Sequence, residues 1–221
     1  MKDRFARFAP LISGLLFVAF VVISNAQTNS APDNSATGET VLAYSKTHGD
    51  KMGGAGFSLA LSVVTGLFFY GILRSYLRTS KRAEWASAIG FAGAIIFAAG
   101  ALAQAGIDFT ISDVKDNITA PAAQTLNILQ GDIGAFFIQA GLCALMLGFG
   151  IAMLRSRTFS RWLGWATIVI GIFAIAGPLI GLAVPLEGLW VLYVSVLLFM
   201  GNAIVSPAPE QSVNDQRIAA P

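Results

Sequence analysis

A long uncharged stretch in the second half of the chain places the strongest constraint on its fold. Residues 133–154, IGAFFIQAGLCALMLGFGIAML, are 22 residues without a charged side chain. As a helix that rises ~1.5 Å per residue, this stretch is long enough to cross ~30 Å of hydrocarbon. Gly134, Gly141 and Gly148 recur every seven residues. They therefore share one helix face, which a second helix can approach closely.

Several other stretches have the same character, so the sequence predicts an all-α membrane protein. Of the 221 residues, 55% are hydrophobic and 12% are charged, against ~25% charged in a typical soluble domain. A lipid environment accommodates that much apolar surface on the outer faces of helices. We expect one transmembrane domain over residues 1–205, built as a six-helix bundle with spans at about 8–26, 54–77, 85–107, 132–154, 162–183 and 188–205.

The two ends of the chain differ from the spans between them. Residues 1–7 are basic, residues 8–23 are apolar, and small and polar residues follow at 24–27. This order fits either a cleaved signal peptide or a retained first span. We favour a retained span because the apolar run is at the long end for a signal peptide. Residues 206–221 are polar and contain proline, which predicts a disordered tail.

The distribution of basic residues predicts the orientation in the membrane. Eleven of the 14 lysines and arginines lie at residues 1–7, 74–84 and 155–161 and in the tail. Basic residues gather on the cytoplasmic side of membrane proteins. We therefore expect both termini in the cytoplasm and a long first outer loop over residues 27–53. The resulting location is the cell (inner) membrane, with a multi-pass topology.

The segments outside the apolar runs carry their own signals. Residues 39–48 are expected to form a short helix that ends at Gly49, with Tyr44 and His48 on one face. Thr119 and Pro121 favour the start of a helix, which then projects from the membrane up to residue 131 or breaks at Gly131. Pro178 is expected to kink the fifth span.

Five polar residues are candidates for a site at the outer surface. Gln104 and Asp108 are four apart, and Asp132 and Gln139 are seven apart, so each pair shares a helix face. Glu187 opens the predicted last span on the same side. If the third and fourth spans are neighbours, these residues line an acidic cavity that binds a cation or a polar solute. Alternatively, Asp132 and Glu187 are acids that favour helix starts.

Four short segments resemble those of a group of mostly actinobacterial multi-pass membrane proteins of unknown function. The segments are VLAYSKTH at 41–48, AAQTLN at 122–127, WLGW at 162–165 and GLWVLYVS at 188–195. The resemblance implies a bacterial inner-membrane protein with a long first outer loop. It implies no activity and assigns no catalytic residue.

The residue types within the spans argue against the common intramembrane chemistries. The single histidine and all five lysines lie outside the predicted spans, and the single cysteine, Cys143, lies within one. Bis-histidine haem, a retinal Schiff base and a disulfide therefore have no suitable residues. The net charge of +2 gives no indication of nucleic-acid binding. We expect no cofactor and no metal.

Two functions remain from the sequence. The first is a non-enzymatic protein with a structural or regulatory role in the bacterial envelope, in contact with the lipid bilayer and working through a homo-oligomer or a membrane-protein partner. Its basis is the presence of small-residue faces without charge at depth. The second is a small transporter or channel-like protein that uses the outer acidic cavity. A cavity that reaches the middle of the membrane favours the second.

Overall fold

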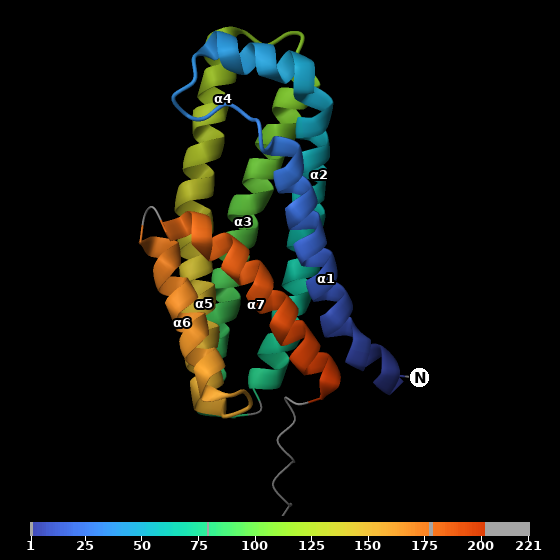
Figure 1. The fold of residues 1–221 in the computed structure, drawn as a ribbon, viewed down its shortest axis with the longest axis vertical. Coiled ribbons are helices and arrows are strands. Elements are labelled where there is room, and N and C mark those ends of the chain that lie inside the picture. Colours follow the sequence, from blue (N-terminus) through green and yellow to red (C-terminus); the bar gives the residue numbers. More distant parts are fainter. Residues whose placement is uncertain (1, 79, 177–178, 202–221) are drawn as a thin grey trace, which may run out of the picture.

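The chain folds into a long bundle of helices (Figure 1). A computed structural model describes residues 2–78, 80–176 and 179–201. The described residues contain helices and connecting turns but no strand. The elements are α1 (Lys2–Thr28), α2 (Gly38–Leu77), α3 (Glu84–Val114), α4 (Ala120–Ile133), the π-helix η1 (Gly134–Ile138), α5 (Gln139–Ser156), α6 (Arg161–Ile175) and α7 (Ile180–Met200). The all-α prediction is confirmed.

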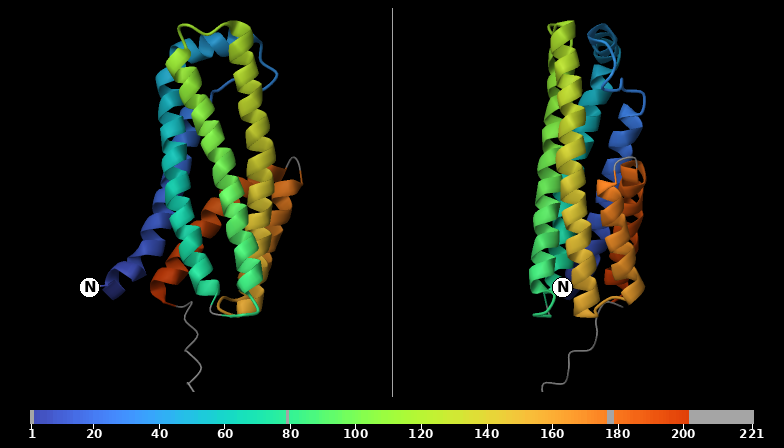
Figure 2. Two further views of the ribbon diagram at one scale, coloured as in Figure 1. Left: turned by 180° about the vertical axis from the view of Figure 1, so that it is seen from behind. Right: turned by 90° about the vertical axis from the view of Figure 1, so that its left-hand side faces the viewer.

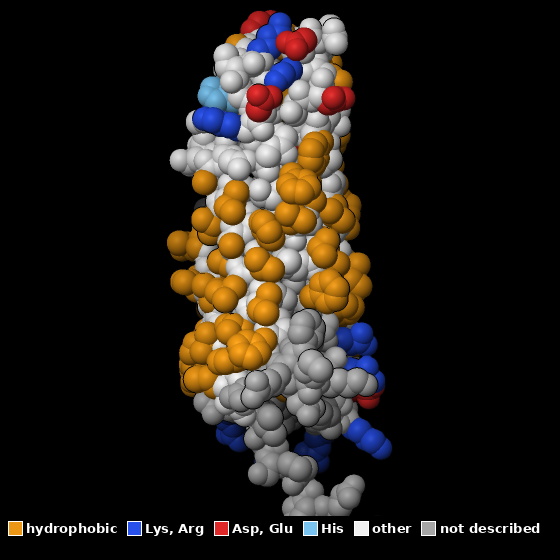
Figure 3. Space-filling model, turned by 90° about the vertical axis from the view of Figure 1, so that its right-hand side faces the viewer, with side chains coloured by type: hydrophobic (Ala, Val, Ile, Leu, Met, Phe, Trp, Pro, Cys, Tyr) orange, Lys and Arg blue, Asp and Glu red, His pale blue; other side chains and the backbone are white. Residues whose placement is uncertain are grey.

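Five helices are long and apolar enough to cross a membrane. They begin and end at Phe8–Thr28, Gly38–Leu77, Glu84–Val114, Ala120–Ser156 and Gly181–Met200, and the fourth combines α4, η1 and α5. Helix α6 has 15 residues, or ~22 Å, and is shorter than the hydrocarbon core. On the face that Figure 3 shows, apolar side chains cover the middle of the bundle and charged side chains lie near its two ends. This pattern supports a membrane protein.

Helix α2 replaces much of the predicted outer loop. Its 40 residues correspond to ~60 Å, twice the thickness of the hydrocarbon. The first turns of α2 lie across one end of the bundle, and the remainder runs along its length (Figure 1). The predicted helix end at Gly49 is therefore wrong. The side chains of Tyr44 and His48 do share a face, with their rings stacked 4.5 Å apart.

Helix α4 continues into η1 and α5 without interruption. The predicted break at Gly131 is therefore wrong, and the irregularity is a π-helical turn three residues later, over Gly134–Ile138. Thr119 is the N-cap residue of α4, although its side chain makes no capping hydrogen bond. Helix α3 also extends seven residues beyond the predicted end at 107. Helices α3 and α4 thus extend to the same end of the bundle, which we call the projecting end (Figure 2).

The predicted boundary between the fifth and sixth spans is wrong. Helix α6 ends at Ile175, and α7 has already begun at Ile180, so residues 180–183 belong to the last helix. Together α6 and α7 form a hairpin that covers only part of the length of the bundle, and α7 crosses it obliquely (Figure 1). Pro178, the expected kink, and the tail at 206–221 lie outside the described residues.

Gly141 and Gly148 lie in a close contact between α5 and α3, whereas Gly134 lies in η1 with no backbone of another helix within 4 Å of its Cβ position. A Cβ on Gly148 would come within 2.5 Å of Gly90 Cα, and one on Gly141 within 2.6 Å of Phe97 Cα. Helices α3 and α5 therefore pack backbone against backbone at two of the three glycines that the seven-residue spacing placed on one face. Cys143 is buried elsewhere on α5, where it serves as a small packing residue.

Candidate functional site

Glu187 lies inside α7, seven residues after the helix begins, and its side chain is only 2% exposed. Tyr70 of α2 donates a hydrogen bond from Oη to Glu187 Oε1 at 2.5 Å. The tyrosine is also 2% exposed. The oblique path of α7 brings these residues together although they are 117 positions apart in the chain. A carboxyl group at depth in a membrane helix is expensive, and such residues commonly have a functional role.

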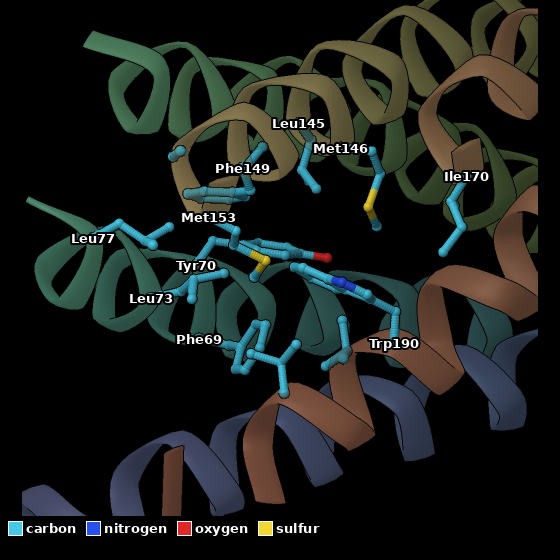
Figure 4. Close-up of a cluster of buried hydrophobic side chains, with 14 of the residues drawn as sticks. Phe69, Tyr70, Leu73, Leu77, Leu145, Met146, Phe149, Met153, Ile170 and Trp190 are labelled. Carbon is cyan, nitrogen blue, oxygen red and sulfur yellow. The ribbon is translucent and has the colours of Figure 1, made fainter. Parts of the chain in front are cut away.

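An aromatic cluster holds Tyr70 in place. Its ring stacks on that of Phe149 at 6.0 Å and meets Phe17 edge-on at 6.0 Å. Phe69 packs between Tyr70 and Trp190. Figure 4 shows the Tyr70 hydroxyl extending from these rings, with Trp190 alongside. The cluster therefore fixes the direction from which the hydroxyl reaches the carboxyl group.

Trp190, one turn after Glu187 in α7, forms a hydrogen bond that joins α7 to α6. Its Nε1 donates a 2.7 Å hydrogen bond to Thr167 Oγ1. The hydroxyl of Thr167 in turn donates to the carbonyl oxygen of Leu163, also at 2.7 Å. Both Trp190 and Thr167 are buried. Glu187 is thus positioned by a hydrogen bond to α2 on one side and by the Trp190 anchor to α6 on the other.

A cavity of about 910 Å³ lies between α1 and α7, and Glu187 forms part of its wall. Most of the lining is aliphatic or aromatic, and the other polar side chains are the amides of Asn25 and Asn29. The described residues that line it are Phe17, Val18, Val21, Val22, Asn25, Ala26, Asn29, Phe97, Gly181, Val184, Pro185, Glu187, Gly188, Leu189 and Leu192. The volume lies within the range of ~300–1,000 Å³ that is typical of small-molecule sites.

The structure separates the five predicted site residues. Asp108 is buried and accepts a 2.5 Å hydrogen bond from Gln130 of α4. Gln104 is partly buried and lies beside η1, with Oε1 3.4 Å from the position of a Cβ on Gly134. Asp132 is exposed and Gln139 is partly buried. The partner of Asp108 is thus an amide rather than a second carboxylate.

Glu187 is hydrogen-bonded to Tyr70 of α2 and, among the described residues, to none of the other four candidates. The prediction that it opens the last span is wrong, because α7 begins seven residues earlier. Sequence reasoning also missed Tyr70. A glutamate in the otherwise uncharged run from residue 179 to 205 was the available signal, but the predicted spans at 162–183 and 188–205 placed Glu187 between them, at the outer surface.

The projecting end of the bundle is held by polar contacts among α2, the end of α3, α4 and the loop before α2. Asn127 Nδ2 donates to the carbonyl oxygen of Asp33, and Lys115 Nζ pairs with Asp50 at 2.7 Å. The hydrogen bond to Asp50 raises the pKa of Lys115, and a hydrogen bond from the Ser35 side chain lowers the pKa of Asp33. These contacts give the end a defined shape.

No group of three or more histidines, cysteines and acids that could hold a metal ion is present among the described residues. Comparison with protein-family models, curated proteins and solved structures finds no match. The resemblance to actinobacterial membrane proteins therefore stays a prediction. The function has to be argued from the cavity and from Glu187.

Proposed function

We propose that the protein is a non-enzymatic integral membrane protein that binds a hydrophobic small molecule between α1 and α7. The observation that carries this proposal is the cavity of about 910 Å³ whose wall includes a carboxyl group buried inside α7. Among the described lining residues, Glu187 has no second acid, no base and no nucleophile beside it. One carboxyl group within apolar walls suits the orientation of a ligand better than its chemical conversion.

The cavity is accessible from the lipid-facing surface. Two of its lining residues, Val22 of α1 and Leu189 of α7, are 60% and 64% exposed. Their exposed surfaces lie on helices that are long and apolar enough to span a membrane. A ligand that partitions into the bilayer can therefore enter the cavity laterally, from the lipid, between α1 and α7. This supports a hydrophobic ligand over a water-soluble one.

The proposed location is the cell (inner) membrane of a bacterium, with both termini in the cytoplasm. In the first form of the proposal, ligand binding serves a structural or regulatory role, through a homo-oligomer or a membrane-protein partner. In the second form, the protein is a small transporter. Glu187 favours the second form, because acids at depth often mark substrate pathways in transporters.

The test measures binding of the neutral fluorophore diphenylhexatriene to the purified full-length protein in lipid nanodiscs. Energy transfer from tryptophan to the probe is followed as the probe concentration rises. The transfer has a saturable component if the probe occupies a site, and it rises only linearly if the probe dissolves in lipid. The Gly181→Phe variant fills the cavity, because a Cβ on Gly181 meets nothing within 4 Å. Gly106→Phe is the matched control, since its Cβ is equally unobstructed and lies outside the cavity.

We expect a saturable component that Gly181→Phe removes and Gly106→Phe retains. A purely linear signal from the unmodified protein would exclude cavity binding. Proteoliposomes loaded with the same probe then separate the two forms of the proposal. Faster protein-dependent movement between vesicles that Gly181→Phe abolishes indicates transport, whereas binding without such movement indicates the regulatory form.

A further inference from the structure

The wall of the α1–α7 cavity carries an acidic side chain, and no basic side chain is present among its described lining residues. Glu187 is its ionisable side chain, and neither lysine nor arginine appears among the described lining residues. The two asparagines are neutral, and Asn25 Nδ2 already donates to the carbonyl oxygen of Val21 in its own helix. A ligand in this cavity therefore meets an acid without a basic neighbour.

The carboxyl group is also incompletely paired within the protein. Tyr70 donates to Oε1, and no other hydrogen bond to Glu187 is present within the described residues. Arg74, one turn further along α2, lies over the ring of Phe91 with Cζ 5.3 Å from its centroid. Among the described residues, Glu187 forms no ion pair, and the pair that is present joins Lys115 and Asp50 at the projecting end of the bundle. The second oxygen of Glu187 is thus available to a ligand.

The size of the cavity constrains the kind of cation that this acid would pair with. A buried carboxylate is stable when it is paired, because its desolvation is otherwise uncompensated. A bare inorganic cation would need several oxygen ligands at short range, and apolar walls do not provide them. A volume of about 910 Å³ lined by valine, leucine and phenylalanine suits a molecule with a large apolar body.

We propose that the ligand is an organic cation with an apolar body, whose positive group lies against Glu187. This inference rests on the proposed function and names the ligand class of the same cavity. Tyr70 keeps its hydrogen bond to Oε1 and orients the carboxyl group, while Oε2 faces the cation. The apolar body fills the space between Phe17 and Leu192.

The test compares two probes of nearly the same shape and opposite charge, tetraphenylphosphonium and tetraphenylborate. Equilibrium dialysis with the purified full-length protein in detergent gives their affinities. Each is measured for the unmodified protein, for Glu187→Gln, and for Asp132→Asn as the matched control. Asp132 is an exposed acid on α4, so its substitution changes net charge without altering the cavity.

We expect the cation to bind at least about tenfold more tightly than the anion, a factor that modest ion pairing supplies. Glu187→Gln should remove that preference, and Asp132→Asn should preserve it. Equal binding of both probes to the unmodified protein overturns the inference, and this comparison needs no folded variant. Saturable diphenylhexatriene binding without charge preference would leave the proposed function intact, whereas absence of saturable binding for all three probes would overturn both.

Discussion

The close packing of α3 on α5 yields a sharp prediction about stability. A Cβ on Gly148 would lie 2.5 Å from Gly90 Cα and would come closer still to Gly90 N. These are backbone atoms of the neighbouring helix, so no change of side-chain rotamer relieves the overlap. We therefore predict that Gly148→Ala destabilises the protein, although alanine is the better helix former.

The size of the destabilisation by Gly148→Ala follows from the distance between the new Cβ and Gly90. Ordinary van der Waals contact begins at 3.4 Å, so the helices have to separate by at least 0.9 Å at this point. Overpacking of this kind costs ~1–3 kcal/mol of stability. The higher helix propensity of alanine relative to glycine offsets up to ~1 kcal/mol of this cost. With the full offset, the expected net loss in the free energy of unfolding is up to about 2 kcal/mol.

The assay is unfolding of the purified protein in mixed detergent micelles by titration with dodecyl sulfate, followed by circular dichroism. Gly106→Ala is the matched control, because Gly106 is also on α3 and a Cβ there meets nothing within 4 Å. We expect Gly106→Ala to be neutral or stabilising by up to ~1 kcal/mol. Equal unfolding free energies for the two variants would refute the close-packing argument.

Three further predictions concern other parts of the bundle. Trp190→Phe removes the 2.7 Å hydrogen bond to Thr167 and should lower the free energy of unfolding by ~1 kcal/mol or more in the same titration. Arg157 has a φ of 56° at the end of α5; Arg157→Gly should raise the unfolding free energy by ~1 kcal/mol, because glycine adopts this conformation without strain. Single cysteines at Ser35 and Ser80, in a cysteine-free background, should label from opposite sides of the membrane with an impermeant reagent in intact cells; equal labelling from outside contradicts the predicted orientation.

The sequence predicted the parts of the fold that depend on local composition. Uncharged runs of about 20 residues identified helices α1, α2, α3 and α5, because lipid permits only chain segments whose backbone groups are satisfied internally. The spacing of Gly141 and Gly148 also predicted which face of α5 makes a close helix contact, and the structure places α3 there. Neither the positions of these helices nor the contact face of α5 depends on residues that are far apart in the sequence.

Helix ends were harder to predict because hydropathy marks the edge of the membrane rather than the end of a helix. Residues 38–53 are polar enough to lie in water, yet they are helical because α4 and the end of α3 pack against them. Similarly, an expected span length of ~20 residues extended the fifth span to 183, whereas α6 ends at Ile175. A short helix followed by an oblique one has no distinct pattern in an apolar sequence.

Glu187 was a candidate from the sequence, but its depth and its partner were missed for a different reason. The depth of Glu187 depends on the path of α7 across the bundle, and its partner Tyr70 is 117 residues away. No periodicity connects two single residues at that separation. The outer candidates, by contrast, were chosen by spacing along helices, which correctly placed Gln104 and Asp108 on α3 but could not show that Gln130 is the partner of Asp108.

The packing of α1 leads to a last prediction, that residues 1–26 are retained in the mature protein. Ser24 Oγ donates to the carbonyl oxygen of Ala55 in α2 at 3.0 Å, and Phe17 is 2% exposed beside Tyr70. A Cβ on Gly14 would come within 3.1 Å of Ser195 Cβ and closer to its Oγ, so α1 and α7 are in direct contact.

The same helix forms one wall of the proposed ligand cavity, through Phe17, Val18, Val21, Val22, Asn25 and Ala26. Cleavage after residue 26 would leave Glu187 and Tyr70 facing lipid on that side, where a carboxyl group is costly. Intact-mass spectrometry of the protein purified from its membrane should therefore give the mass of a chain that includes α1. A mature chain beginning at Gln27 would contradict the prediction and would also remove the cavity on which the proposed function depends.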